Sequence, residues 1–78
     1  MQSQQHTMSD LFAQLGLKDD RASIESFIRH HRPLPDDVEL TDAPFWSPTQ
    51  AAFLRAEHDK DADWVGPIDV LDVRLRRR

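Results

Sequence analysis

The side chains that could take part in chemistry are four histidines, several serines and 14 carboxylates, and they form no recognised catalytic motif. Cysteine is absent, so thiolate nucleophiles, thiolate metal sites and disulfides are excluded. The chain has two glycines, and no glycine-rich turn presents a serine or holds a phosphate. We therefore predict that the protein is not an enzyme, and we assign it no catalytic or cofactor-binding residue.

A calcium loop is the nearest metal motif in the sequence, and it is incomplete. Its first three ligand positions would be filled by Asp59, Asp61 and Asp63. Trp64 stands where the loop needs its glycine, and Val70 stands where it needs a bidentate glutamate. We therefore expect a solvated turn between two helices at this place.

The histidines provide no local metal site either. His30 and His31 are adjacent, and adjacent side chains on a helix point about 100° apart. A site built by the tertiary structure from His31, His58 and an aspartate stays open as an alternative. We assign no metal ligand, and metal binding is the second of two alternative functions.

Positive charge is concentrated at the carboxyl end of the chain. Residues 1–73 contain all 14 acids and 6 of the 10 lysines and arginines, which gives them a net charge of −8. The other four bases are Arg74, Arg76, Arg77 and Arg78. An acidic body repels a phosphate backbone, which disfavours nucleic acid as a partner. Binding of nucleic acid or of an acidic partner by these four arginines is the first alternative function.

An aromatic pair, Phe45–Trp46, lies between Pro44 and Pro48. Tryptophan is enriched at the energetic centres of protein interfaces, so the pair is a candidate partner contact together with the four arginines. Such a pair is more often part of a core. The sequence leaves open whether Phe45 is exposed.

Two helices are predicted in the first half of the chain. Apolar side chains recur at helical spacing from residue 8 to residue 15, and Gly16 can take the left-handed conformation that ends a helix. A second helix is predicted at about residues 20–31, with Asp19, Asp20 or Ser23 as its cap. Pro33 stops it.

The next segment, residues 32–46, is a long connector punctuated by Pro33, Pro35 and Pro44. Its apolar side chains are expected to cover the groove between the helices. A brief strand at Val38–Leu40 is a weaker interpretation, because it would lack a partner.

The clearest helix start in the sequence follows the aromatic pair. Ser47 is a helix cap, Pro48 fits the first helical position, and Gln50 completes a capping box. The helix should run from Pro48 to about Asp59. Its buried stripe is predicted to contain Thr49, Ala52, Phe53 and Ala56, with Leu54 beside it.

A last helix should carry apolar side chains at Trp64, Ile68, Leu71 and Leu75. Gly66 and Pro67 interrupt this pattern, so the sequence leaves open whether the helix begins before or after them. The β-branched residues from Val65 to Val73 leave a strand as a weaker alternative.

These elements predict an all-α single domain of four helices with the long proline-punctuated connector between helices 2 and 3. We expect a flexible N-terminus at residues 1–7, a helical domain at 8–75 and a basic tail at 76–78. The predicted core consists of Leu11, Phe12, Leu15, Ile24, Phe27, Ile28, Leu40, Phe45, Trp46, Phe53, Trp64, Ile68 and Leu71.

Four segments occur in an order that resembles a small proteobacterial family, the domain-of-unknown-function family 2789. They are MSDLFAQLGL, SIESFIRHHRPLP, DAPFWSPTQAAFLR and DADW. The resemblance covers nearly the whole chain, and its most specific part is APFWSPTQAAFLR. It implies a helical domain in a bacterial cytoplasm, and it implies no activity and no site residues. The Gly66–Pro67 pair departs from the family pattern, which continues there as an unbroken helix.

The leading hypothesis is therefore a non-catalytic protein-interaction module that binds an unidentified protein or a second copy of itself. No apolar run approaches the length of about 20 residues that crosses a bilayer, and the N-terminus does not resemble a signal peptide. We expect a cytoplasmic protein without membrane contact.

Overall fold

The computed structural model describes residues 7–60 and 62–77. The elements in order are the α-helices α1 (Met8–Gln14) and α2 (Arg21–His31), the short 3-10 helix η1 (Leu40–Asp42), and the α-helices α3 (Pro48–Lys60) and α4 (Ala62–Arg76). These ranges contain helices and no strand, so the all-α prediction is confirmed and the two strand alternatives are wrong. Within the same ranges, no helix has both the length and the apolar character needed to cross a membrane.

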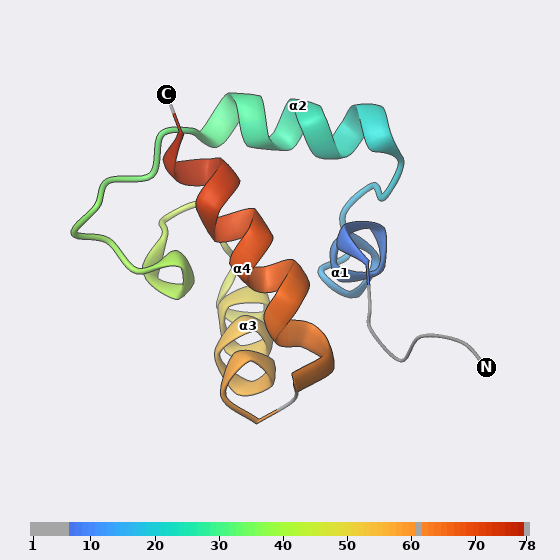
Figure 1. The fold of residues 1–78 in the computed structure, drawn as a ribbon, viewed down its shortest axis with the longest axis vertical. Coiled ribbons are helices and arrows are strands. Elements are labelled where there is room, and N and C mark those ends of the chain that lie inside the picture. Colours follow the sequence, from blue (N-terminus) through green and yellow to red (C-terminus); the bar gives the residue numbers. More distant parts are fainter. Residues whose placement is uncertain (1–6, 61, 78) are drawn as a thin grey trace.

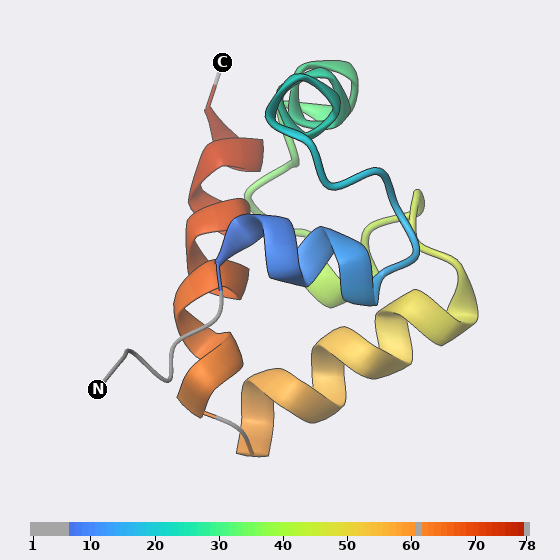
Figure 2. The same cartoon turned by 90° about the vertical axis from the view of Figure 1, so that its right-hand side faces the viewer.

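The central element is α4, which packs against each of the other three helices (Figure 1). Figure 2 shows α1 lying across α4, with α2 on one side of α1 and α3 on the other. The connector between α2 and α3 carries η1, which packs against α3. Its start is fixed to the end of α4, since the Leu34 amide donates to the Leu75 carbonyl at 2.7 Å.

The ends of the first two helices follow from local chemistry. Thr7, in the segment expected to be flexible, caps α1 in a capping box with Asp10. Residues 1–6 of that segment lie outside the described residues. Gly16 has a φ of 74°, and the amides of Gly16 and Leu17 donate to the carbonyls of Ala13 and Phe12. This is the hydrogen-bond pattern of a left-handed glycine cap.

The helix α3 begins as predicted, but it presents a different face to the core. Ser47 and Gln50 form the capping box, with bonds of 2.9 and 3.1 Å. In α3, Leu54 is fully buried, whereas Thr49, Ala52 and Ala56 are exposed and Phe53 is half-buried. The predicted buried stripe is wrong because α4 and η1 both pack against α3, and their positions fix the face that turns inward.

The helix α4 begins at Ala62 and continues through Gly66 and Pro67, which settles where it starts. A proline ring crowds the Cβ of the residue before it when that residue is helical. Gly66 has no Cβ, so this particular contact is absent in α4. Apart from its chain neighbours and the backbone of its own helix, nothing lies within 4 Å of the position that a Cβ on Gly66 would take.

Most of the predicted core residues are confirmed as buried. Ten of them are buried, namely Leu11, Phe12, Leu15, Ile24, Ile28, Leu40, Trp46, Trp64, Ile68 and Leu71. Phe27, Phe45 and Phe53 are half-buried at its edge. The core also holds four apolar residues that the prediction omitted, Leu34, Ala43, Leu54 and Leu75. Leu34 and Ala43 lie in the connector, which fills the space between the helices.

Candidate protein-interaction surface

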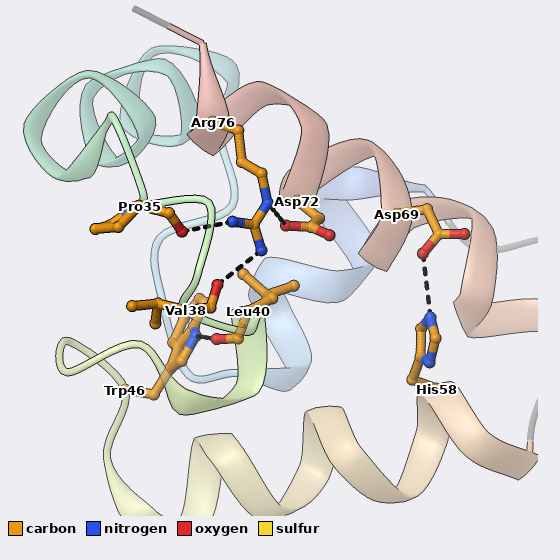
Figure 3. Close-up of polar contacts among 8 residues, drawn as sticks. All are labelled: Pro35, Val38, Leu40, Trp46, His58, Asp69, Asp72 and Arg76. Carbon is orange, nitrogen blue, oxygen red and sulfur yellow. Dashed lines mark hydrogen bonds and ion pairs between the residues drawn. The ribbon is translucent and has the colours of Figure 1, made fainter.

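The aromatic pair divides into one core residue and one residue at the core edge. Trp46 is 7% exposed, and its indole N–H donates to the Leu40 carbonyl at 2.8 Å (Figure 3). Phe45 is half-buried, and its ring stacks on the imidazole of His31 at a centroid distance of 4.3 Å. Phe27 lies beside both aromatic residues, at 5.7 Å from Phe45 and 5.5 Å from Trp46. The pair therefore lies at the edge of the core, and the ring that is partly exposed is that of Phe45.

His31 is built into this aromatic edge rather than held free for chemistry. Its ring lies 4.4 Å from that of Phe27. Burial lowers the pKa of His31, because the apolar surroundings disfavour the imidazolium, and the neighbouring His30 lowers it further. His31 therefore borders the core.

The C-terminal arginines are partly used inside the molecule. A carboxylate oxygen of Glu25 accepts a hydrogen bond from Arg74 at 2.6 Å, which lowers the pKa of Glu25. Arg76, within α4, donates to Asp72 at 2.8 Å and to the carbonyls of Pro35 and Val38 at 2.7 and 2.9 Å (Figure 3). It therefore ties the connector to the last helix.

The remaining candidates are Arg77 and Arg78. Arg77 is exposed directly after the end of α4, and Arg78 lies outside the described residues. Of the three described candidate arginines, Arg74 and Arg76 are held in ion pairs inside the molecule, so these three do not form one free basic cluster.

The serine–histidine pair on α2 is not arranged for nucleophilic catalysis. The Nδ1 atom of His30 lies 2.8 Å from the backbone carbonyl of Ser26 and 3.4 Å from its hydroxyl. The carbonyl can only accept, so Nδ1 carries the proton and cannot take one from Ser26. Both side chains lie at the surface.

The hypothetical metal site is not assembled either. The Nε2 atom of His58 lies 3.1 Å from a carboxylate oxygen of Asp69. Figure 3 marks this contact, while His31 belongs to the aromatic edge. Among residues 7–60 and 62–77, no three histidine or acidic side chains form a group that could hold a metal ion. The incomplete calcium loop falls at the junction of α3 and α4. Its middle member, Asp61, lies outside the described residues.

The outer face of α4 carries an apolar surface that the sequence analysis did not identify as a site. Val70 is 51% exposed and Val73 is 55% exposed, and they are the exposed large apolar side chains of the described residues. A shallow hollow around them is also lined by Asp69, Arg74 and Arg77. We call these five residues the α4 strip.

The α4 strip could have been found from the sequence. The core stripe of α4 uses the positions of Trp64, Ile68, Leu71 and Leu75, and Val70 and Val73 fall off that stripe. Apolar residues outside the core stripe of a helix mark a second face. In the sequence these valines support only the weaker alternative, in which the segment is a strand.

Comparisons with known proteins agree with the fold and add no activity. A family model described as "Protein of unknown function (DUF2789)" matches residues 1–75. The solution NMR structure of protein CV0237 from Chromobacterium violaceum is 49% identical in sequence and has a TM-score of 0.79. The match covers 97% of this chain and 95% of that chain. No curated protein matches the chain.

Proposed function

Because the chain belongs to the DUF2789 family, whose function is unknown, we propose from its geometry that it is a small non-catalytic protein-interaction module. Its binding surface is the α4 strip. The single observation that supports this proposal is the exposure of Val70 and Val73 side by side on the central helix of the fold.

The α4 strip has the composition of a small contact site. An apolar patch framed by charged side chains gains free energy when it is covered, and the charges set the orientation of the partner. Asp69 and Arg77 are exposed on either side of the valines along the helix. Because α4 also contacts the other three helices, the strip is held by the most constrained element of the fold.

The half-exposed Phe45 is a weaker candidate for the contact. Its ring is packed against Phe27, His31 and Trp46, so part of its surface is already covered by the protein itself. Trp46 offers even less surface to a partner, since its side chain is buried and its indole N–H already donates to the Leu40 carbonyl. We therefore take α4, rather than the aromatic pair, as the leading candidate surface.

The two alternative functions have less support. Arg74 and Arg76 are bound to Glu25 and Asp72, which leaves less positive charge available to a phosphate backbone or an acidic partner. Metal binding lacks a cluster of ligands within the described residues. We propose the cytoplasm as the location, and a chain without cysteine suits that reducing compartment.

A photo-cross-linking side chain placed at Val70 or Val73, in the bacterium that carries the gene, tests the proposed function. The matched control places the same group at Ala22, which is exposed on α2. We expect discrete cross-linked protein products from the two α4 positions and none from Ala22. Equal yields from all three positions, or no product from any, would contradict the proposal.

A further inference from the structure

The α4 strip has an arrangement of charges that fits a copy of itself. The helix carries Asp63 in its first turn and Arg74 and Arg76 in its last turn, so one end is acidic and the other basic. The same order holds on the exposed face, where Asp69 precedes the valines and Arg77 follows them. When two copies of such a surface face each other in opposite directions, the acidic end of each copy meets the basic end of the other.

The side chains of one helical face supply the contact. At about 100° per residue, Gly66, Asp69, Val70 and Val73 project to the same side of α4, and all four are exposed. Arg77, directly after the end of the helix, is exposed as well. Gly66 adds no side chain to this face, and the space above it is open. The long side chain of an arginine can therefore lie across Gly66 without obstruction.

We infer that the partner of the α4 strip is a second copy of this chain, docked antiparallel through a two-fold axis between Val70 and Val73. This inference rests on the proposed function. In such an isologous contact each pairing of two positions occurs twice, once from each copy. Val70 of each copy faces Val73 of the other, Asp69 lies near the basic side chains Arg74 and Arg77, and Gly66 faces Arg77.

The antiparallel direction follows from electrostatics. Parallel docking would set Arg77 against Arg77 and Asp69 against Asp69, and like charges in contact disfavour a complex. Antiparallel docking converts both repulsions into attractions and also opposes the two helix dipoles. Asp69 and Arg74 already bind His58 and Glu25, but a carboxylate accepts several hydrogen bonds and a guanidinium donates five.

The dimer is expected to be weak. One helix face against another is a small interface, and interfaces at the low end of the size range belong to transient complexes. The acidic bodies of the two copies also repel each other, since the chain carries a net charge of −4. We expect association in the micromolar range or weaker, from about 10 μM to about 1 mM.

Analytical ultracentrifugation of the full chain across that concentration range tests the association itself. We expect a reversible monomer–dimer equilibrium that Val73→Lys weakens by about tenfold or more. Ala22→Lys, on the exposed side of α2, is the matched control and should leave the equilibrium unchanged. A chain that stays monomeric throughout, or a dimer unaffected by Val73→Lys, overturns the inference.

A charge exchange tests the direction of docking. The Asp69→Lys chain and the Arg77→Glu chain should each associate less than the unaltered chain, because each places like charges at both ends of its dimer. A mixture of the two should regain association, because the mixed dimer has opposite charges at both ends. Parallel docking already sets like charges together, so there each variant alone should associate as well as the unaltered chain. That result, or a mixture that restores nothing while the unaltered chain dimerises, shows that the antiparallel arrangement is wrong.

Single cysteines give a second measure of direction in a chain that has none of its own. Antiparallel docking predicts that the Val70→Cys chain forms disulfides faster with the Val73→Cys chain than either forms with itself. Faster like-with-like pairing indicates parallel docking and contradicts the inference.

The two proposals can fail separately. If the chain is monomeric but the photo-cross-linker at Val70 joins it to a different protein, self-association is wrong and the interaction function stands. If the protein is monomeric and no cross-linked product forms, both are wrong.

Discussion

Individual side chains at the aromatic edge show how chemically active residue types are used for packing. His31 is covered by the rings of Phe27 and Phe45, and the indole of Trp46 finds its acceptor at Leu40. Among the described residues, no buried side-chain nitrogen or oxygen lacks a hydrogen-bond partner. A polar group that is already satisfied inside the fold is held by its structural role.

The depressed pKa of His31 predicts a pH dependence of stability. Burial holds the folded-state pKa below its ordinary value of 6.5, so the unfolded chain takes up the proton first as the pH falls. The free energy of unfolding should therefore fall as the pH drops through 6.5 and rise again as the pH increases. Urea unfolding of the protein and of His31→Phe between about pH 5 and about pH 8 measures this, and the variant should show a flatter dependence.

The control for this experiment is His58→Gln, since His58 is exposed and remote from the aromatic edge. This variant should retain the part of the pH dependence of unfolding that comes from His31. An unchanged slope in His31→Phe would show that other groups cause the pH dependence.

At the scale of elements, the start of α3 joins two helices as well as beginning one. The Gln50 side chain accepts from the Ser47 amide at 2.9 Å, as the capping box requires. The same side chain donates to the Leu15 carbonyl at the end of α1 at 2.8 Å. One amide group thus completes the cap of α3 and binds a carbonyl that ends α1.

Substitutions of Gln50 can separate these two roles. Gln50→Glu keeps an acceptor for the Ser47 amide but cannot donate to Leu15, whereas Gln50→Ala loses both bonds. We expect Gln50→Ala to lower the free energy of unfolding by about 1–2 kcal/mol and Gln50→Glu to lower it by less. Ser47→Ala, which removes only the cap, should cost about 1 kcal/mol.

Chemical unfolding of these three variants provides the measurement. If Gln50→Glu is as stable as the unaltered chain, the bond to Leu15 contributes nothing to stability. If Gln50→Ala and Ser47→Ala cost the same, the cap alone explains the role of Gln50.

For the molecule as a whole, the connector is held by the last helix. Arg76 binds two carbonyls of the connector and one carboxylate of α4, and the Leu34 amide is bound to Leu75. These contacts link segments that are far apart in the sequence. They explain how a long irregular segment, uncommon in so small a domain, is kept in place.

Replacing Arg76 with lysine should loosen this attachment. A lysine has a single ammonium group and cannot reproduce the fork of a guanidinium that reaches three acceptors. We expect Arg76→Lys to lower the free energy of unfolding by about 1–2 kcal/mol. Amide hydrogen exchange at Leu34 should become faster as well.

The matched control is Arg29→Lys, at an exposed position on α2, which should change stability by less than about 0.5 kcal/mol. Unaltered exchange at Leu34 in Arg76→Lys would show that the connector is fixed by its buried apolar side chains alone.

The amino-acid sequence is sufficient to place the elements whose signals are local. Caps, prolines and helical spacing act within a few residues. These local signals therefore place the start of α3 at Ser47–Gln50 and the end of α1 at Gly16. The same local patterns predicted most of the core, and the absence of catalytic activity remains a prediction.

The tertiary structure decided what depends on neighbours distant in the chain. Which face of α3 turns inward was fixed by α4 and η1, so Leu54 is buried and Ala52 is exposed. The roles of Arg74 and Arg76 depended on Glu25 and on the connector, which local spacing cannot reveal. Likewise, the sequence pattern places Val70 and Val73 outside the core stripe of α4, but their exposure depends on how the other helices pack against that helix.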